Sequence, residues 1–308
     1  MKETQYQKKG IALIYLAKKF FTLSVGDRIP TVDELCVETD TSRGTMQNAL
    51  ETLKEDGAIK TLSRGHLGTF LLEQNQDKLL NYMDDRNIVC AMPLPYTKYY
   101  EGLSTGLYKA FENRQLNLNL AYVNGSVNRL NGLIGNRFDF IMTSGLTADY
   151  LVENYNVQLI KMFPDKTNVS SHVLVHKKNT VMKKYTGIHD GMNVGVDSHS
   201  IDYKLLTNEV IKNHKVNLVE TPYNQMVQRI ENGSLDVAIW NRDEIDEKNY
   251  PIDFEPINSD LIEKASQAAL LCRRDNDFIK EIVEKYADTK KITFVQELVI
   301  SGEILPEY

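Results

Sequence analysis

The sequence has no apolar run long enough to cross a membrane, which takes ~18 to 20 consecutive apolar residues. Near the start, the run Ile11–Ala17 follows two lysines, but Lys18 and Lys19 end it and no small-residue cleavage site follows. These features favour an amphipathic first helix over a signal peptide. We therefore expect a cytoplasmic protein with no membrane partner.

Cysteine is scarce in this chain. The 308 residues include three cysteines, Cys36, Cys90 and Cys272, which are odd in number, far apart and in apolar surroundings. Such cysteines are typical of reduced core thiols in an intracellular protein. A disulfide or a catalytic thiol is the alternative interpretation, although none of the three stands beside a histidine.

An excess of positive charge is also missing. The formal net charge is -6, and the first eighty residues hold as many acidic as basic side chains. The N-terminal part is therefore the less acidic part, but the average surface does not attract nucleic acid. Any contact with DNA has to come from a local patch.

The common signatures of enzyme sites are absent as well. We find no Gly-x-Ser-x-Gly sequence, no glycine-rich phosphate loop and no spacing typical of zinc ligands. His172 and His176 are four residues apart in a stretch that reads as a strand, and His189 and His199 have no carboxylate partner in a motif. We predict no catalytic residue, no metal and no cofactor, and hence no enzyme.

The first eighty residues carry a dense set of helix signals instead. One helix is expected over Gln5–Leu23. Thr31, with Glu34 three residues later, has the spacing of a capping box and predicts a short helix over Val32–Glu38. A tight turn then leads to Ser42, the expected cap of a third helix.

The third helix has one apolar face. Its apolar residues recur at positions i, i+3, i+4 and i+7, which indicates burial of that face. They are Met46, Ala49, Leu50 and Leu53. Gly57 is expected to end the helix, and a hairpin with its turn at residues 63–66 follows. This order of elements predicts a winged helix-turn-helix.

The stretch "GDRIPTVDEL…TSRGTMQNALETLKEDGAIKTLSRGHLGTFL" resembles the N-terminal domain of GntR-type bacterial transcription regulators, over about residues 10–72. The resemblance implies a homodimer that binds double-stranded operator DNA. Together with the polar face of the third helix and the hairpin turn, it implies a set of DNA-contacting residues. They are Thr31, Ser42, Arg43, Thr45, Gln47, Asn48, Arg64, Gly65 and His66.

The sequence departs from the GntR pattern at three positions that lower positive charge. Asp33 stands where many members have an arginine, and Gln47 with Asn48 replaces a common arginine pair. Phosphate contacts supply most of the salt-dependent affinity, whereas amides can pair with adenine and Arg43 with guanine. We therefore expect a dimer with a modest salt dependence. The alternative is a solvated helix face, or a module that binds protein.

The remaining two-thirds of the chain alternate between strand and helix patterns, which predicts a parallel α/β arrangement. The phrases "LNGLIGNRFDFIM" and "VQRIENGSLDVAIW" share one plan, with Asp139 and Asp236 just before the strands. The near-repeat suggests two similar lobes and resembles the type II periplasmic-binding-protein fold. A GntR-like start joined to such a domain resembles the YhfZ-like regulators.

The predicted fold is therefore α/β, with an N-terminal winged helix-turn-helix followed by a two-lobed α/β domain of the periplasmic-binding-protein type. We place the first domain at residues 1–74, a linker at 75–86 and the effector-binding domain at 87–308. The segment "VEKYADTKKITFVQELVISGEI" is expected to form one or two helices. They either pack in a dimer or close the second lobe.

Ligands of open α/β sheets bind beyond the carboxyl ends of the strands. Backbone N–H groups at a helix start after such a strand favour an anion. The predicted ligand-binding residues are Tyr96, Thr143, Ser144, Ser198, His199, Ser200, Trp240 and Arg242. The alternative is that the serines and threonines only cap helices.

Taken together, the sequence predicts a DNA-binding transcription regulator whose C-terminal domain binds a small anionic metabolite that modulates operator binding. Two alternatives stay open. The first alternative is an enzyme built on the periplasmic-binding-like domain, and the second is a small-molecule-binding protein whose winged helix no longer binds DNA.

Overall fold

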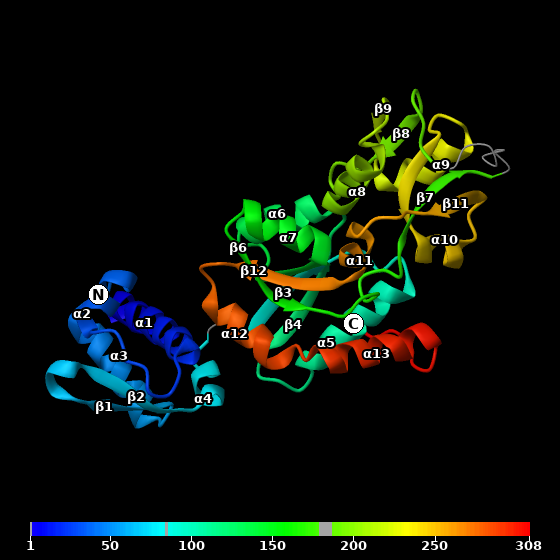
Figure 1. Cartoon of the computed structure of the whole chain (residues 1–308). Helices are drawn as coiled ribbons and strands as arrows, with labels where there is room; N and C mark the ends of the chain where they lie inside the picture. The colour runs from blue at the N-terminus through cyan, green and yellow to red at the C-terminus, as the bar shows by residue number, and fades with distance from the viewer. Residues whose placement is uncertain (1, 84–85, 179–186) are drawn as a thin grey trace. The chain divides into compact units, whose positions relative to one another are not determined.

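A computed structural model describes residues 2–83, 86–178 and 187–308 of the chain (Figure 1). Residues 84 and 85 of the predicted linker lie outside the described part. The chain divides into two compact units. One contains Met1–Ile88, and the other contains most of the remainder, including Leu118–Asp275.

The N-terminal unit contains three helices and a hairpin. Its elements are α1 (Lys2–Thr22), α2 (Val32–Thr39), α3 (Arg43–Glu55), β1 (Ile59–Ser63) and β2 (Thr69–Gln74). The hairpin is antiparallel, and an isolated bridge joins Arg28 to Phe70 of β2. A short helix, α4 (Gln76–Leu80), follows. The observed order agrees with the helix-turn-helix and wing expected from the sequence.

The apolar face of α3 is buried as its spacing predicts. Met46, Ala49 and Leu53 are fully buried, and Leu50 is nearly so. The stripe contributes to one core with buried residues of α1, among them Leu16. The polar face of α3 is left exposed, which is the arrangement that a DNA-reading helix requires.

Helix α2 begins with the complete capping box that its sequence predicts. Thr31 Oγ1 accepts the N–H of Glu34, and the Glu34 carboxylate accepts the N–H of Thr31 at 2.6 Å. The Thr31 N–H lowers the pKa of Glu34. Since the folded pKa is lowered, this contribution to stability is present above the ordinary glutamate pKa of about 4.3. It is lost as the pH falls through the lowered value.

Replacing Thr31 by alanine is expected to lower the free energy of unfolding of the N-terminal unit by about 1 kcal/mol, the usual cost of losing a threonine cap. The measurement is urea denaturation followed by circular dichroism. Thr52→Ala is the matched control, because the Thr52 hydroxyl only bonds the Asn48 carbonyl of its own helix. Equal effects of the two substitutions would contradict the capping role.

The larger unit has two lobes, each built on a five-stranded sheet (Figure 1). Across the first sheet the strands are β4 (Asn117–Tyr122), β3 (Asn87–Met92), β5 (Phe140–Ser144), β12 (Ala268–Arg273) and β6 (Val157–Met162). The helices of this lobe are α5 (Lys98–Phe111), α6 (Ser126–Ile134) and α7 (Gly145–Asn154).

The second lobe repeats this plan. Across its sheet the strands are β9 (Asn217–Glu220), β8 (Asn193–Val196), β10 (Val237–Asn241), β7 (His172–Lys177) and β11 (Ile252–Pro256). Its helical elements are α8 (Ile201–Ile211), η3 (Tyr223–Gln225), α9 (Met226–Glu231), α10 (Arg242–Lys248) and α11 (Leu261–Ser266). The chain crosses between the lobes after β6 and again before β12.

The near-repeat of the sequence corresponds to equivalent contacts in the two lobes. The Asp139 carboxylate accepts the N–H of Val89 at 2.8 Å, and the Asp139 N–H donates to the Val89 carbonyl. Asp236 makes the same two bonds with Asn193. Each aspartate thus ties the start of a central strand to its parallel neighbour. Two similar lobes are confirmed on this evidence.

The predicted parallel arrangement is present only in part, because both sheets are mixed. After each crossing the chain enters the new sheet antiparallel to its central strand, β7 beside β10 and β12 beside β5. Strands β11 and β6 then pair antiparallel with β7 and β12. Strand direction depends on where a crossing segment re-enters a sheet, and the local pattern of side chains does not encode it.

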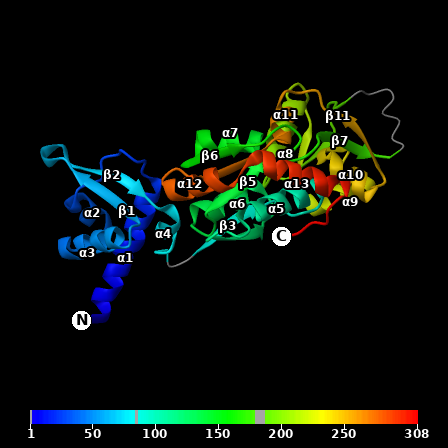
Figure 2. The same cartoon turned by 90° about the horizontal axis from the view of Figure 1, so that it is seen from below.

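The C-terminal segment forms two helices, α12 (Asp277–Tyr286) and α13 (Thr289–Ser301). Helix α13 lies alongside α5 of the first lobe, so it does not close the second lobe, which was one of the two roles expected from the sequence (Figures 1 and 2). The approach is close because Gly102 and Gly106 have no side chain. A Cβ atom at either position would lie within 3 Å of Gln296 or Ile292.

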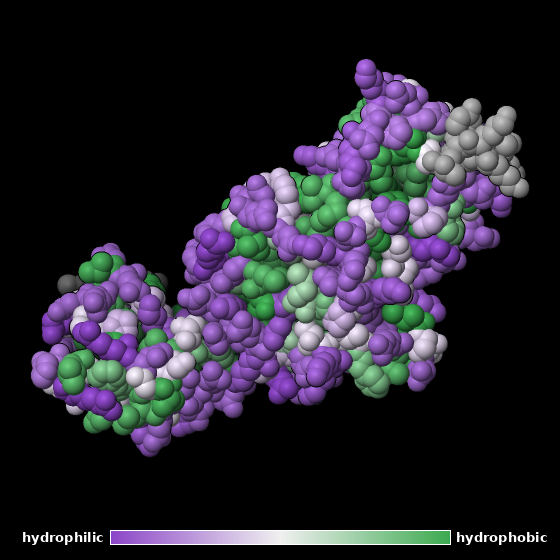
Figure 3. All heavy atoms as spheres, in the orientation of Figure 1, coloured by the Kyte–Doolittle hydropathy of each residue, from purple (hydrophilic) through white to green (hydrophobic). Residues whose placement is uncertain are grey.

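Hydrophilic residues cover most of the face drawn in Figure 3. Among the described residues, no helix is both long enough and apolar enough to pass through a bilayer.

Candidate functional site

The exposed face of α3 carries the side chains that the sequence assigns to DNA. Ser42 caps the helix, its Oγ accepting the N–H of Thr45, while Gln47 and Asn48 are exposed. Thr31 is exposed at the start of α2. The amide groups are therefore accessible to base edges, and Thr31 and Ser42 stand at helix starts where free N–H groups favour phosphate.

Arg43 is not free on this face. Its Nη1 donates to both carboxylate oxygens of Asp33, at 2.6 and 2.8 Å. Both side chains are more than half exposed, so the pair contributes little to stability. The pair does neutralise Arg43 on the exposed face of α3, and Asp33 is one of the three positions at which the sequence departs from the GntR pattern.

The wing presents Arg64, Gly65 and His66 in an exposed turn between β1 and β2. Gly65 has a φ of +58°, which glycine adopts without strain. The Arg64 guanidinium lies 4.9 Å from the centre of the Phe70 ring. The wing tip is thus positioned outward, with its arginine resting on the hairpin.

A second candidate site is a cavity of about 70 Å³ between the two lobes. Its polar lining residues are Asn124, Ser126, Arg129, Ser144, Asn168, His172, Asp197, Ser200, Asp202 and Asn241. Its aromatic lining residues are Tyr96, Tyr100, Tyr203 and Tyr223. Since one water needs roughly 10–15 Å³ on this measure, the cavity as observed holds a few waters or an equally small group.

Arg129 is the only buried cation among the described lining residues, at 6% exposure. Its Nη1 donates to the Val123 carbonyl, and its Nε has no hydrogen-bond partner within the described residues. Burial lowers the pKa of Arg129 to about 10, which leaves it charged near neutral pH. The nearby Asp202 carboxylate opposes this shift, but no ion pair to Arg129 is recorded among the described residues, so its guanidinium keeps the capacity to bind an anion directly.

The two lobes are joined beside this cavity by the start of α8. The Asp202 carboxylate of the second lobe accepts the hydroxyls of Ser144 and Thr147 from the first, at 2.5 and 2.8 Å. The Ile201 N–H donates to Ser126 Oγ at 2.9 Å. The anion at the start of α7 is therefore Asp202, although the sequence predicts a ligand at this position.

His172 lies in the wall of the cavity on β7 and is 4% exposed. Burial lowers its pKa, an effect that the nearby Asp202 opposes. The imidazole is therefore neutral near pH 7, with one donor and one acceptor nitrogen. Its Nδ1 is buried and has no hydrogen-bond partner in the described part of the chain.

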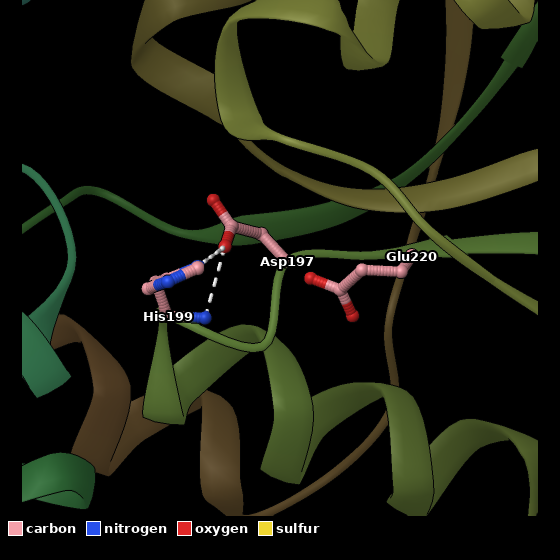
Figure 4. Close-up of side chains that lie close together, drawn as sticks. All are labelled: Asp197, His199 and Glu220. Carbon is pink, nitrogen blue, oxygen red and sulfur yellow. Dashed lines mark hydrogen bonds and ion pairs between the residues drawn. The ribbon is translucent and has the colours of Figure 1, made fainter.

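The turn after β8 brings together Asp197, His199 and Glu220 (Figure 4). Each offers one atom that could bind a metal, all within 4.8 Å of one another. Asp197 accepts the N–H groups of His199 and Tyr223, and Glu220 accepts that of Ser198. These bonds show that both carboxylates hold the backbone of the turn, so we interpret Asp197 and Glu220 as structural residues and not as metal ligands.

The predicted ligand residues divide into two groups. Tyr96, Ser144 and Ser200 line the inter-lobe cavity. The others lie elsewhere: Thr143 is buried in β5, Ser198 and His199 are in the adjacent turn, Trp240 lines a second cavity, and Arg242 pairs with Asp246 at 2.9 Å. Thr143 and Trp240 fall on strands rather than beyond them, which turns their side chains into the core.

Sequence reasoning missed Arg129, His172, Asp197 and Asp202. Arg129 occurs inside a predicted helix, and His172 was interpreted as a lone structural histidine. These residues come together in the cavity because the chain crosses between the lobes, and the sequence carries no local signal for those crossings. Asp202, two residues after the predicted Ser200, is the one that its position at a helix start could have identified.

Comparison with known proteins places the chain among relatives with the same organisation. Residues 75–308 match the family described as YhfZ C-terminal domain, and residues 24–71 match a helix-turn-helix domain family. The protein YhfZ of Escherichia coli (strain K12) is 31% identical over 310 residues, which is 100% of both chains. The crystal structure of YhfZ from Shigella flexneri is 30% identical with a TM-score of 0.63, covering 75% of this chain and 97% of that one.

More distant structures resemble the larger unit in fold alone. One is an ancestral arginine-binding protein bound to arginine, 12% identical with a TM-score of 0.51, covering 70% of this chain and 97% of that one. Another is the ligand-binding component of an ABC-type import system from Staphylococcus aureus with zinc bound. It is 14% identical with a TM-score of 0.50, covering 68% of this chain and 78% of that one. The C-terminal fold is therefore α/β and periplasmic-binding-protein-like.

Proposed function

Because the chain belongs to the YhfZ family and joins a helix-turn-helix domain to a periplasmic-binding-protein-like domain, we propose that it is a DNA-binding transcription regulator controlled by a small effector. The proposal assigns DNA binding to residues 1–74, a linker to 75–86 and effector binding to 87–308. A regulator of this kind needs no catalytic group, and the helix-turn-helix match favours a role other than catalysis.

The observation that carries the effector proposal is Arg129, a buried cation without an ion pair in a polar cavity. A small anionic metabolite would give the guanidinium a direct ion-pair partner beside the carboxylates of Asp197 and Asp202 that also line the cavity. His172 and Asn168 offer further polar atoms in the same wall. Because about 70 Å³ admits only a small group, a larger effector requires the lobes to separate at the Asp202 contacts, and binding would then shift the population of lobe arrangements.

For DNA we propose a homodimer in which two α3 helices occupy neighbouring half-sites. The GntR resemblance of residues 10–72 supports a winged helix-turn-helix of this type. Gln47 and Asn48 would read adenine, and Arg43 would reach guanine or phosphate after leaving Asp33. The effector then alters operator affinity by favouring one arrangement of the two DNA-binding domains.

The test is the affinity of the full chain for genomic DNA fragments, measured at several salt concentrations with and without a panel of anionic metabolites. We expect a subset of fragments to bind far more tightly than the rest. We also expect one metabolite class to change that affinity. Uniformly weak binding to every fragment would overturn the regulator proposal, and an unchanged affinity with every metabolite that binds would overturn the effector step.

Exchanging both Gln47 and Asn48 for alanine should lower the ratio of specific to non-specific affinity by tenfold or more. The reason is that each good bidentate amide contact discriminates by ~1–3 kcal/mol. Non-specific affinity should change less than about threefold, since neither side chain carries charge. Fluorescence anisotropy on specific and scrambled duplexes measures both quantities.

The control for this pair is Asn208→Ala with Asn213→Ala, two exposed amides in and after α8 of the other unit. It should leave the ratio unchanged. A uniform loss of affinity on every sequence from the Gln47 and Asn48 exchange would mean that α3 does not read bases through its amides.

One observation favours a second candidate function. Arg43 is paired with Asp33, and Lys54, the other cation of α3, lies 3.6 Å from Glu51, so this helix offers DNA no unpaired cation among its described residues. A small-molecule-binding protein whose winged helix makes no specific DNA contact fits this pairing. A linear dependence of log affinity on log salt with a slope near zero would favour it.

A further inference from the structure

A second and larger cavity is lined by residues of the second lobe and by Tyr96, which follows β3 of the first. Its volume is about 280 Å³, and its walls include four aromatic rings, those of Tyr96, Tyr223, Trp240 and Tyr250. Tyr223 stacks on Trp240 with ring centres 4.1 Å apart, and Tyr96 stacks on Tyr223 at 5.7 Å. None of these rings is needed for the anion site around Arg129, although Tyr96 and Tyr223 form a wall common to both cavities.

The same cavity contains buried negative charge. The Glu244 side chain is 2% exposed and accepts hydrogen bonds from the hydroxyls of Tyr223 and Tyr250. Glu231 also lines the cavity, which gives it two carboxylates. Buried carboxylates need a cation, and aromatic faces attract one because of their electron-rich centres.

The cation now present is the side chain of Lys248. Its Nζ donates to Glu244 at 2.7 Å and lies 4.9 Å from the centre of the Tyr96 ring and 5.9 Å from that of Tyr250. An ammonium group among tyrosine rings and a carboxylate is the chemistry that recognises organic ammonium ligands. Lys248 is 39% exposed at the end of α10, so its flexible side chain can leave.

We propose that this cavity is a second ligand site, which binds a small organic ammonium compound in the place that the Lys248 ammonium occupies. The ligand's charge would meet Glu244, and its alkyl groups would pack on the rings of Tyr96, Tyr223 and Trp240. Because Tyr223 also lines the inter-lobe cavity, and its N–H holds Asp197 at 3.0 Å, the site adjoins the proposed effector site. The ammonium site does not depend on that proposal.

The chain contains one tryptophan, so the fluorescence of tryptophan comes from Trp240 in the wall of this cavity, and the variants below separate it from the inter-lobe cavity. The experiment titrates the full chain with tetramethylammonium chloride, against potassium chloride at equal ionic strength. We expect a saturable change in Trp240 emission with tetramethylammonium and none with potassium. A linear change that is the same for both salts would overturn the proposal.

Three variants identify the groups that bind. Glu244→Gln should weaken tetramethylammonium binding at least tenfold, Tyr96→Leu should weaken it severalfold, and Lys248→Met should strengthen it severalfold by removing the competing ammonium. Tyr96 and Lys248 are at the surface, so these two variants decide the matter if Glu244→Gln does not fold. Binding that is unchanged in Tyr96→Leu and Lys248→Met would overturn the proposal.

The matched controls come from another Glu–Lys pair. Lys212 Nζ bonds Glu209 at the same distance of 2.7 Å on α8, where no ring contact of the pair is recorded among the described residues. Glu209→Gln and Lys212→Met should leave the titration unchanged. Arg129→Met should also leave it unchanged, which separates this site from the proposed effector site. A loss of tetramethylammonium binding in Arg129→Met would mean that the probe enters the inter-lobe cavity instead.

Discussion

Replacing Arg129 by methionine is expected to abolish effector binding while making the free protein more stable. The guanidinium is buried, charged and without an ion pair in the described residues, so the folded chain bears its desolvation cost. Methionine has a similar length and carries no charge. We expect the free energy of unfolding to rise by about 1 kcal/mol and the affinity for an anionic effector to fall at least a hundredfold.

Two measurements check the expected gain in stability and the expected loss of effector affinity. Urea denaturation gives the stability of the free protein, and a thermal-shift screen of anionic metabolites gives binding. Every metabolite that raises the melting temperature of the parent chain should fail to do so in Arg129→Met. Arg129→Lys, which keeps the charge, should retain part of the response, and Arg137→Met, at an exposed position of the same lobe, should retain all of it. An unchanged metabolite response in Arg129→Met would exclude the guanidinium as the anion site.

Asp33→Asn is expected to raise DNA affinity about tenfold on every sequence. The substitution releases Arg43 from its two hydrogen bonds to the Asp33 carboxylate and removes a negative charge from the recognition surface. One additional phosphate contact per protomer should steepen the salt dependence by about 0.9 in log units, or about twice that for a dimer. Anisotropy titrations on random duplex DNA at three salt concentrations measure both effects.

The control for this experiment is Asp77→Asn, which changes the net charge equally but lies in the first turn of α4. It should shift affinity less than twofold, because it frees no arginine. An equal gain from both variants would mean that overall charge, and not the Arg43–Asp33 pair, limits DNA binding. No gain from Asp33→Asn would instead favour the second candidate function.

The N-terminal unit was predictable because its signals are local. A capping serine or threonine, an acidic residue three positions later and an apolar stripe all act within one or two turns of helix. Thr31, Glu34 and Ser42 therefore make in the structure the bonds that their spacing predicts. What escaped prediction is the Arg43–Asp33 pair, since it joins two helices across ten residues.

In the larger unit the sequence predicted the elements but not all of their directions. In the near-repeat, Asp139 and Asp236 occupy equivalent positions just before a strand. In the structure each carboxylate bonds the backbone of the neighbouring parallel strand. The antiparallel direction of β7 and β12 was not predicted, because each strand follows a crossing between the lobes. A strand pairs with the sheet edge that it reaches in space, and its direction there does not appear in the apolar and polar pattern of the sequence.

By itself the sequence determined where the capped helices α2 and α3 begin, which face of α3 is buried and that two similar lobes follow a helix-turn-helix. These outcomes depend on residues within a few positions of one another, or on a repeat. Only the tertiary structure decided that Asp202 fills the anion position at α7, that Arg129 lies unpaired in the inter-lobe cavity and that Lys248 stands among aromatic rings. Each of these depends on groups brought together by chain crossings or by packing, and such distances are fixed only when the whole domain has folded.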